Sequence, residues 1–460
     1  MSLPRTSAHA HKNHKIDMTS GSIMWLVVLF ALPICLGNIL QQLYTTVDTI
    51  VIGRYCSAQS LAAVGTSSQP VELLLNLFLG IGGGISILVA QYVGSGDNAS
   101  LNRLIHTSTT FLYVIGLTVS ILGLFVGPLV LIFMQCPADT YDLAVLYIRI
   151  VFLGSLGNIG YNLNAGILRG LGDSAATLML LMISCFVNIV LDIVFVGNFK
   201  MDVAGAALAT SVALFASWVG SIIYIKKKYS ELNFPVLPKS YDRDMLGNII
   251  RIGLPLGLNN SIYSIGHILL QTLVNAQGSI FIAGCSVGTK VNGIANVAIT
   301  SFSSACTTFA GQNLGAKKYK RLKKGGYLIP FSSGAFTLTM GILFLLFCTP
   351  VLSVFTKDAE VLSVATQYMR IVLPSSWIYA IFNGIICYAN GLGEVRYPTV
   401  VNILMLWAVR IPTAYFIAEF IGGEYIMACF PVSFTFGCIC MLFFYRSKRW
   451  RNVCRLAKEG

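Results

Sequence analysis

Twelve long apolar runs constrain the fold of this chain more than any other feature of its sequence. A helix needs ~20 apolar residues to cross the hydrocarbon core of a bilayer, and each run reaches that length between charged residues, Gly and Pro. The runs are continuous rather than alternating, which favours helices over the strands of a membrane barrel. The predicted spans are residues 22–53, 61–93, 104–133, 142–167, 175–197, 202–225, 247–275, 281–311, 327–350, 361–388, 397–418 and 424–445.

The composition excludes the main soluble classes of protein. Charged residues make up 11% of the 460 residues, which is about half the share found in a soluble domain. The mean hydropathy is +0.75. A soluble enzyme, a disordered chain, a collagen and a coiled coil are therefore excluded. We predict an all-α membrane protein with twelve transmembrane helices that lies in a lipid bilayer.

The positive charges indicate how the chain is oriented in the membrane. With the N-terminus in the cytoplasm, 24 of the 31 Lys and Arg residues fall on the cytoplasmic side, and only Arg54, Lys200 and Lys357 fall outside. Such a bias sets membrane topology, so the net charge of +13 does not indicate nucleic-acid binding. Residues 1–21 are polar and lack the features of a signal peptide. We predict a multi-pass protein of the inner (plasma) membrane with both termini in the cytoplasm.

The two halves of the chain repeat each other. The repeated motifs are Tyr147–Val151 and Tyr368–Val372, Gly170–Asp173 and Gly391–Glu394, Gln91 with Gly94 and Gln312 with Gly315, and Leu32–Pro33 and Leu254–Pro255. Three pairs are 221 residues apart and the last is 222 apart, a register that unrelated apolar helices would not hold. Six spans is an even number, so both halves enter the membrane from the same side. We therefore predict two pseudo-symmetric six-helix bundles related by an axis along the membrane normal, an arrangement that suits alternating access.

These observations divide the chain into five parts. The predicted parts are a cytoplasmic tail at 1–21, an N-lobe at 22–225, a cytoplasmic linker at 226–246, a C-lobe at 247–445 and a basic cytoplasmic tail at 446–460.

Acidic residues inside a membrane are costly and usually functional. Only three of the 18 Asp and Glu residues lie well inside apolar spans, namely Asp48, Glu72 and Asp192, all in the first half. The corresponding second-half spans, 247–275 and 397–418, contain no acid. Acidic residues with a purely structural role would tend to occur in both halves, whereas a single coupling-ion site requires them in only one half. We therefore predict a cation-coupling site in the N-lobe.

Neutral oxygen-bearing side chains surround the two aspartates in the predicted helices. Tyr44 precedes Asp48 by one helical turn and Asn188 precedes Asp192 by the same step, so each pair shares a helix face. Thr210 reaches a similar depth in span 202–225. Na⁺ could bind the oxygens of Asp48, Asn188, Asp192 and Thr210, or the two carboxylates could share a proton. The structural alternatives are a buried ion pair with Arg149 or satisfied hydrogen bonds.

Several further residues are candidates for weaker reasons. Pro33 and Pro255 interrupt hydrogen bonding early in their spans, as a moving bend or a static kink. Glu72, Lys290 and His267 could face a substrate cleft, although a capping, snorkelling or helix-contact role is the alternative for each. We expect a structural role for the deep cation Arg410.

The cysteines and the missing motifs limit the chemistry. Most of the 12 cysteines lie in apolar runs, where they act as small hydrophobic residues, although Cys56 and Cys136 could form a disulfide. The sequence contains no P-loop, no HExxH and no Ser-His-Asp set. We predict no enzyme activity and no cofactor.

Several motifs resemble those of the multidrug and toxic compound extrusion (MATE) family. They are Pro33, Gln41–Asp48, Val51–Arg54, Ala90–Gly94, Leu168–Asp173 and Asn188–Asp192. The resemblance covers nearly the whole chain. It implies a V-shaped pair of bundles in a monomer that exchanges H⁺ or Na⁺ for amphipathic, mostly cationic, organic compounds.

The resemblance also implies which residues act. The N-lobe site of the family is matched here by Asp48, Asn188, Asp192 and Thr210, with Tyr44 nearby. Another branch carries acids in spans 7 and 10, where this chain has Tyr263-Ser264 and Phe382-Asn383. The chain therefore resembles the DinF-like branch.

Three other functions remain as alternatives. A flippase of lipid-linked precursors from the same superfamily would line its cleft with several cations, whereas Lys290 and Arg410 are the only deep cations here. A membrane enzyme would need a catalytic cluster at one membrane face, and a channel would need a ring of charge in both lobes.

Overall fold

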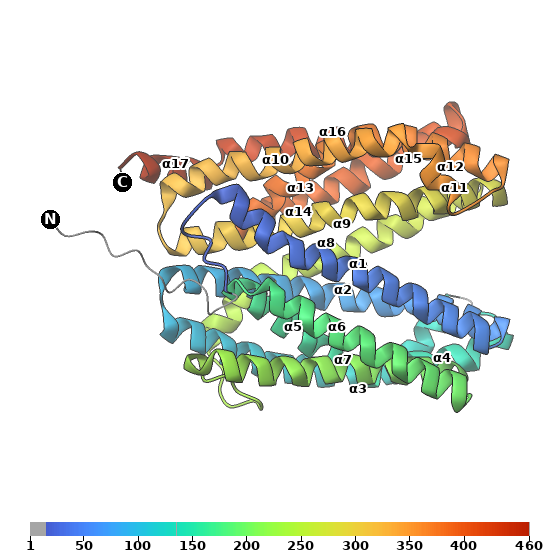
Figure 1. Ribbon diagram of the computed structural model, residues 1–460, viewed down its shortest axis with the longest axis horizontal. Coiled ribbons are helices and arrows are strands. Elements are labelled where there is room, and N and C mark those ends of the chain that lie inside the picture. The colour runs from blue at the N-terminus through green and yellow to red at the C-terminus, as the bar shows by residue number, and fades with distance from the viewer. Residues whose placement is uncertain (1–14, 135, 460) are drawn as a thin grey trace.

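The chain folds into a long bundle of helices in the computed structural model, which describes residues 15–134 and 136–459 (Figure 1). Most of the tail predicted at 1–21 therefore lies outside the described residues. The first-half helices are α1 (Ile23–Tyr55), α2 (Ala58–Ser95), α3 (Asn98–Phe133), α4 (Ala138–Leu153), α5 (Ser155–Leu171), α6 (Ser174–Asp192), the π-helical η1 (Ile193–Asn198) and α7 (Asp202–Lys228).

The second half follows the same plan after a short 3₁₀ turn, η2 (Ser230–Leu232). Its helices are α8 (Arg243–Asn275), α9 (Ser279–Gly315), α10 (Tyr319–Leu346), α11 (Cys348–Ser353), α12 (Ala359–Val372), η3 (Leu373–Ser375), α13 (Ser376–Gly391), α14 (Arg396–Leu404), the π-helical η4 (Met405–Arg410), α15 (Ile411–Phe420), η5 (Gly423–Ala428), α16 (Cys429–Leu442), η6 (Phe443–Arg446) and α17 (Lys448–Glu459).

The helices correspond to the twelve predicted spans. Among the described residues, nine helical stretches are long and apolar enough to cross a membrane, and α4 with α5, bent by 47°, form a tenth. The remaining two are α8 and α9, whose 33 and 37 residues are long enough to span but too polar to pass the same test. The prediction of an all-α membrane protein is therefore confirmed.

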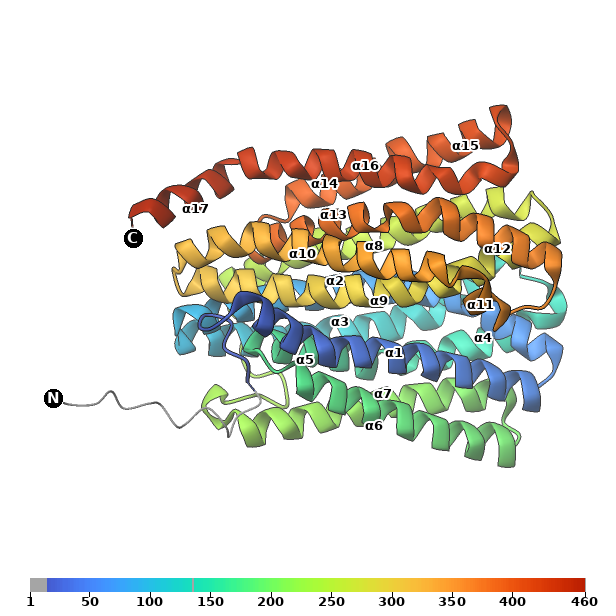
Figure 2. The ribbon, with the colours of Figure 1, turned by 45° about the horizontal axis from the view of Figure 1, so that its top comes forward.

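Two lobes lie side by side, with α2–α7 in the first lobe and α9–α16 in the second (Figures 1 and 2). The first helix of each half crosses between them. Val27 and Phe30 of α1 pack into the core of the second lobe, whereas Val51 and Ile52 pack against the first. The crossing of α8 is the reverse: Ile249, at its start, belongs to the core of the first lobe and Leu270, near its end, to that of the second.

Pro33 and Pro255 lie inside α1 and α8, in the stretch where each helix passes from one lobe to the other. Both prolines therefore interrupt the hydrogen bonding of a helix that connects the lobes. Whether these points move remains a prediction.

Glycines allow the lobes to approach closely where α2 crosses α8. A methyl group on Gly84 would lie 2.6 Å from the Cα atom of Gly253, and Gly80 and Gly257 meet in the same way one turn further along. Only a residue without a side chain fits such a backbone-to-backbone contact.

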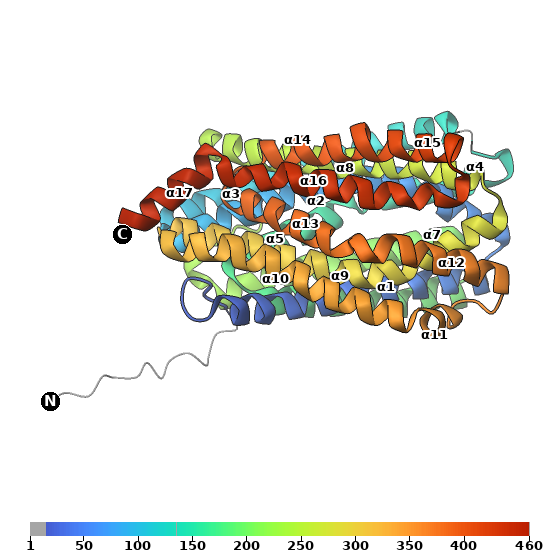
Figure 3. The same cartoon turned by 90° about the horizontal axis from the view of Figure 1, so that it is seen from above.

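The last helix, α17, continues past the end of α16 and packs against α10 (Figure 3). Trp450 is 1% exposed and donates a hydrogen bond to the Tyr327 hydroxyl over 3.3 Å. This end of the molecule, where α1 begins and α2 and α9 finish, is called the α17 end below. Cys56 and Cys136 are both free thiols, so their alternative pairing is not found.

Candidate functional site: an acidic cluster in the first lobe

Five residues predicted for the coupling site lie together in the first lobe. They come from three helices: Tyr44 and Asp48 from α1, Asn188 and Asp192 from α6, and Thr210 from α7. The Tyr44 hydroxyl donates to Thr210 Oγ1 over 3.5 Å, and Asn188 Nδ2 donates to the same oxygen over 3.3 Å. The carboxyl groups of Asp48 and Asp192 are close enough to interact directly. Their role in coupling remains a prediction.

The carboxylate oxygens of this cluster lack donors. Asp192 and Asn188 are fully buried, and Asp48 is partly buried. Asp48 Oδ1, both carboxylate oxygens of Asp192 and Asn188 Oδ1 accept no hydrogen bond from the part of the chain that the structure describes. Buried polar atoms are nearly always paired, so four unpaired oxygens in one place require an explanation. A proton or a hard cation such as Na⁺ fits a site whose free ligands are all oxygens.

A π-helical segment begins directly after Asp192. It covers Ile193–Asn198 and separates the cluster from the start of α7 at Asp202. Such segments are rare and occur frequently at functional sites. The apolar periodicity of span 175–197 does not reveal it, so the sequence analysis missed this feature.

Tyr147 of α4 is a further member that the sequence analysis missed as a site residue. It lies within electrostatic reach of Asp48, Asp192, Tyr44 and Glu72. The available signal was the repeat, because Tyr147 opens the motif that recurs at Tyr368.

The ion pair considered between Arg149 and the aspartates is not found. Arg149 is exposed, and the ion pairs within residues 15–134 and 136–459 do not include it.

The other candidate residues do not join this cluster. Glu72 is exposed on α2, and Lys290 is exposed on α9 without a described hydrogen bond. His267 lies on α8 in the second lobe, beside Tyr263 with ring centroids 6.0 Å apart. Arg410 is fully buried and donates to the hydroxyls of Ser433 and Tyr263, so it does not snorkel.

A pair of glutamines joins the lobes at the α17 end. Gln91 of the first lobe donates to the carbonyl of Gly391 over 3.0 Å, and Gln312 of the second lobe donates to the carbonyl of Gly170 over 3.2 Å. Each bond is the counterpart of the other at the repeat distance of 221 residues. These two reciprocal bonds are called the glutamine clamp below.

Residues just before α1 strengthen the same junction. The backbone N–H of Ile16 donates to the carbonyl of Gly172 in the first lobe over 2.9 Å. The N–H of Met18, which is fully buried, donates to Gln312 Oε1 in the second lobe over 3.0 Å. The segment therefore bridges both lobes beside the glutamine clamp.

Comparison with known proteins agrees with this architecture. The MatE family model matches the chain twice, at residues 33–194 and 255–416, which are the two repeats. The probable multidrug resistance protein YpnP of Bacillus subtilis (strain 168) is 26% identical over 441 residues, covering 95% of this chain and 98% of the relative. The probable multidrug resistance protein YoeA of the same organism is 27% identical over 433 residues, covering 91% of this chain and 92% of the relative.

A solved structure has the same fold at low sequence identity. It is described as an outward-facing conformation of a multidrug resistance MATE family transporter of the MOP superfamily, and it superposes with a TM-score of 0.86 at 22% identity. The match covers 96% of this chain and 99% of that one. Two matches of the family model, which together cover more than half of the sequence, show that this chain is a membrane transporter of the MATE family.

Proposed function

We propose that this transporter is a secondary active antiporter of the plasma membrane. It exports amphipathic, mostly cationic, organic compounds in exchange for H⁺ or Na⁺ by alternating access, as a monomer without a cofactor. The single observation that carries the coupling is the acidic cluster, with its unpaired oxygens on Asp48, Asn188 and Asp192.

Buried carboxylates without a positive partner are unstable in a low-dielectric environment. Asp48 and Asp192 therefore favour any state in which a proton, Na⁺ or an organic cation neutralises them. Binding of the coupling ion and binding of the substrate then compete for the same negative charge. This competition gives exchange when the lobes reorient only with a cation bound, because a lobe that holds one cation has lost its attraction for the other.

The packing suggests which state of the cycle this structure represents. The lobes are joined at the α17 end by the glutamine clamp, and midway along the bundle by a hydrogen bond from Asn76 to Ser264 over 3.1 Å. Towards the opposite end, Gln42, Thr46 and Thr49 of α1 are exposed. Polar side chains at membrane depth usually face water rather than lipid.

The excess of Lys and Arg favours placing the α17 end in the cytoplasm. With that orientation, the contacts between the lobes lie on the cytoplasmic side, and we infer an outward-facing state. An outward-facing state is the one in which the acidic cluster would load its coupling ion from outside.

The path of α1 offers a way to couple charge to movement. Its first turns pack in the second lobe and Asp48 lies in the first, with Pro33 between them. A change of charge at Asp48 therefore acts on a helix that both lobes hold. Repacking of α1 beyond Pro33 would alter the cleft between the lobes.

The proposal is tested by measuring uptake of ethidium into everted membrane vesicles, in which an exporter pumps dye into the lumen. A pH gradient and a Na⁺ gradient are imposed separately. Asp48→Asn and Asp192→Asn should each abolish gradient-driven transport, because the Asn side chain has no negative charge for a proton to neutralise and binds Na⁺ weakly. The protein should remain folded in the membrane. Asp139→Asn, which changes an exposed acid of the same lobe, serves as the matched control and should transport normally. Normal transport by both cluster variants would overturn the site assignment.

A flippase of lipid-linked precursors is less well supported. The relatives reported above are named as multidrug resistance proteins, and the deep cations that would bind a pyrophosphate are few: Lys290 is exposed and Arg410 is fully buried. Translocation of a lipid-linked sugar precursor by reconstituted protein, without ethidium efflux, would favour the flippase.

A further inference from the structure

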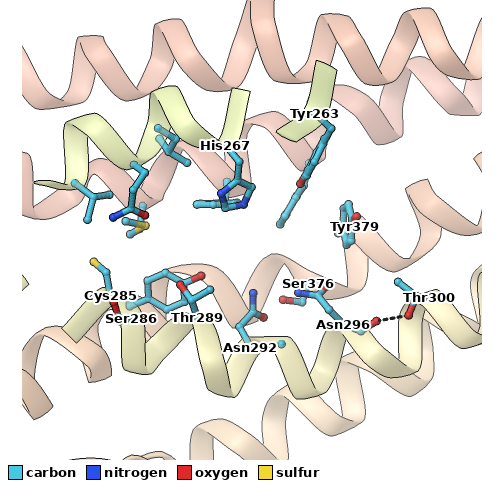
Figure 4. A pocket seen from close by; sticks show the side chains of 18 residues that line it. Tyr263, His267, Cys285, Ser286, Thr289, Asn292, Asn296, Thr300, Ser376 and Tyr379 are labelled. Atoms are coloured by element: carbon cyan, nitrogen blue, oxygen red, sulfur yellow. Dashed lines mark hydrogen bonds between the residues drawn. The ribbon is translucent and has the colours of Figure 1, made fainter. Parts of the chain in front are cut away.

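The second lobe contains a partly open cavity of about 510 Å³, a volume typical of small-molecule sites. Tyr263 and His267 of α8 project into it from one side, and Thr289 and Asn292 of α9 face them from the other (Figure 4). Phe430 and other aromatic residues complete the wall. No Asp, Glu, Lys or Arg occurs among the described residues that line it.

A positive charge lies directly behind this neutral wall. The guanidinium of Arg410 is 4.7 Å from the ring centroid of Phe430 and 5.1 Å from that of Phe434, both of which line the cavity. Arg410 Nη1 donates to the Tyr263 hydroxyl over 3.1 Å. Three residues of the wall therefore contact the same cation.

This cation has no anionic partner among the described residues. Arg410 is 0% exposed, Nη2 has no acceptor, and the ion pairs found in residues 15–134 and 136–459 do not include it. The aromatic faces offset part of the cost of burial, but an unpaired charge in a low-dielectric region still creates a positive potential around it. That potential extends into the adjoining cavity.

Tyr263 links Arg410 to the cavity through its hydroxyl. Because its oxygen accepts a hydrogen bond from Arg410, its own proton is available to donate, and the ring projects into the cavity (Figure 4). A hydroxyl polarised by a guanidinium is a stronger donor than an isolated one. An anionic acceptor beside Tyr263 would thus accept a hydrogen bond from the hydroxyl, and the positive charge of Arg410 would offset its negative charge.

Both lobes carry a buried charge of opposite sign in the fifth span of their half, although at the repeat distance of 221 residues Asp192 matches Thr413 and not Arg410. In the first lobe, the fully buried Asp192 adjoins the π-helical segment η1, and in the second, the fully buried Arg410 ends the π-helical segment η4. Each residue lies in the fifth span of its half. Each lobe therefore has a buried charge next to a π-helical segment, negative in the first lobe and positive in the second.

We propose that the cavity of the second lobe binds an aromatic carboxylate. Its ring would pack among Phe430, Phe434 and Tyr379, and its carboxylate would accept a hydrogen bond from the Tyr263 hydroxyl with Arg410 behind it. This site goes beyond the cation exchange proposed for the first lobe and does not depend on it.

The test uses two probes with the same ring and opposite charge, 1-naphthoate and 1-naphthylmethylammonium. Their affinities for the purified full-length transporter in nanodiscs are measured by equilibrium dialysis, without any gradient. The wild type should bind naphthoate more tightly than the ammonium. Arg410→Gln should weaken naphthoate binding by about tenfold or more, because the carboxylate loses its counter-charge and the Tyr263 donor is no longer polarised by a cation, and it should not weaken binding of the ammonium.

Two milder variants keep the test decisive if Arg410→Gln fails to fold. Arg410→Lys retains the charge and should keep a measurable preference for naphthoate, whereas Tyr263→Phe retains the ring and should weaken naphthoate binding severalfold. Arg370→Gln removes an exposed cation of the same lobe outside this cavity and should bind both probes as the wild type does.

The proposal is overturned if naphthoate binds no more tightly than the ammonium in the wild type. It is also overturned if folded Arg410→Gln or Tyr263→Phe binds naphthoate as the wild type does. Neither outcome depends on ethidium efflux, so failure here is distinct from failure of the proposed antiport.

Discussion

Individual buried charges in this chain differ in whether the protein supplies their partners. Asp173, the last residue of a family motif, is fully buried and accepts hydrogen bonds from Lys228 over 2.7 Å and from the hydroxyls of Tyr224 and Tyr229 over 2.9 Å each. It also caps α6 by accepting from the N–H of Ala176. The acidic cluster has no comparable set of donors. A buried charge whose hydrogen-bond partners come from the protein indicates a structural role. A buried charge without such partners indicates that a ligand binds there.

We therefore expect Asp173→Asn to reduce stability rather than to remove the coupling ion. Loss of one partner of a buried ion pair typically costs about 3–5 kcal/mol, because Lys228 would keep its charge without a counter-charge. The unfolding temperature of the purified protein should fall markedly.

Asp97→Asn is the matched control, because Asp97 caps α3 at an exposed position where Asn caps about as well. It should leave the unfolding temperature nearly unchanged. An equal, small effect of both changes would show that the Asp173 network contributes little.

The sequence predicted the acidic cluster to the extent that helix geometry determines it. Steps of one turn place Tyr44 with Asp48 and Asn188 with Asp192, so the pairs follow once the spans are known. Tyr147 was not predicted as a site residue, because its approach depends on how α4 packs against α2 and α7. The contact between Tyr263 and Arg410 likewise joins residues 147 positions apart, which no local pattern reports.

At the scale of elements, composition predicted the spans well and their irregularities poorly. The ends of most helices lie within a few residues of the predicted ones, because charged residues, Gly and Pro mark the membrane boundaries. The π-helical segments η1 and η4 and the bend between α4 and α5 leave no comparable signal, since an extra residue in one turn does not alter an apolar run. The polarity of α8 and α9 has a structural reason: both line the second-lobe cavity.

The crossing helices allow a paired test of the prolines. Pro33→Ala restores a backbone donor and should stiffen α1, the helix that carries Asp48, so gradient-driven ethidium efflux should fall severalfold. Pro255→Ala is the matched variant in α8, which carries no acid in its membrane span, and it should reduce efflux less. Transport rates are compared at equal amounts of folded protein in the membrane. If both variants transport as the wild type does, the bends are static kinks.

At the scale of the whole molecule, the repeat produces a nearly symmetric scaffold with an asymmetric interior. Both halves send their first helix across to the other lobe and contribute one glutamine to the clamp. Among the described residues, the first half holds the acidic cluster, and the second holds the buried Arg410 behind a cavity. Symmetric contacts suit a junction that must open and close as a unit, whereas asymmetric charges let each lobe bind a different ligand.

The glutamine clamp should therefore control how often the α17 end opens. Each neutral hydrogen bond contributes about 0.5–1.5 kcal/mol, so the double change Gln91→Ala and Gln312→Ala should favour opening by roughly tenfold. Hydrogen–deuterium exchange measured by mass spectrometry should then be faster in the peptides that contain residues 170–173 and 391–394. Gln367→Ala removes a glutamine that bonds to the carbonyl of Glu424 away from the clamp, so exchange at the α17 end should stay slow in that variant. Unchanged exchange in the double variant would mean that the glycine contacts between α2 and α8 hold this end closed without the glutamines.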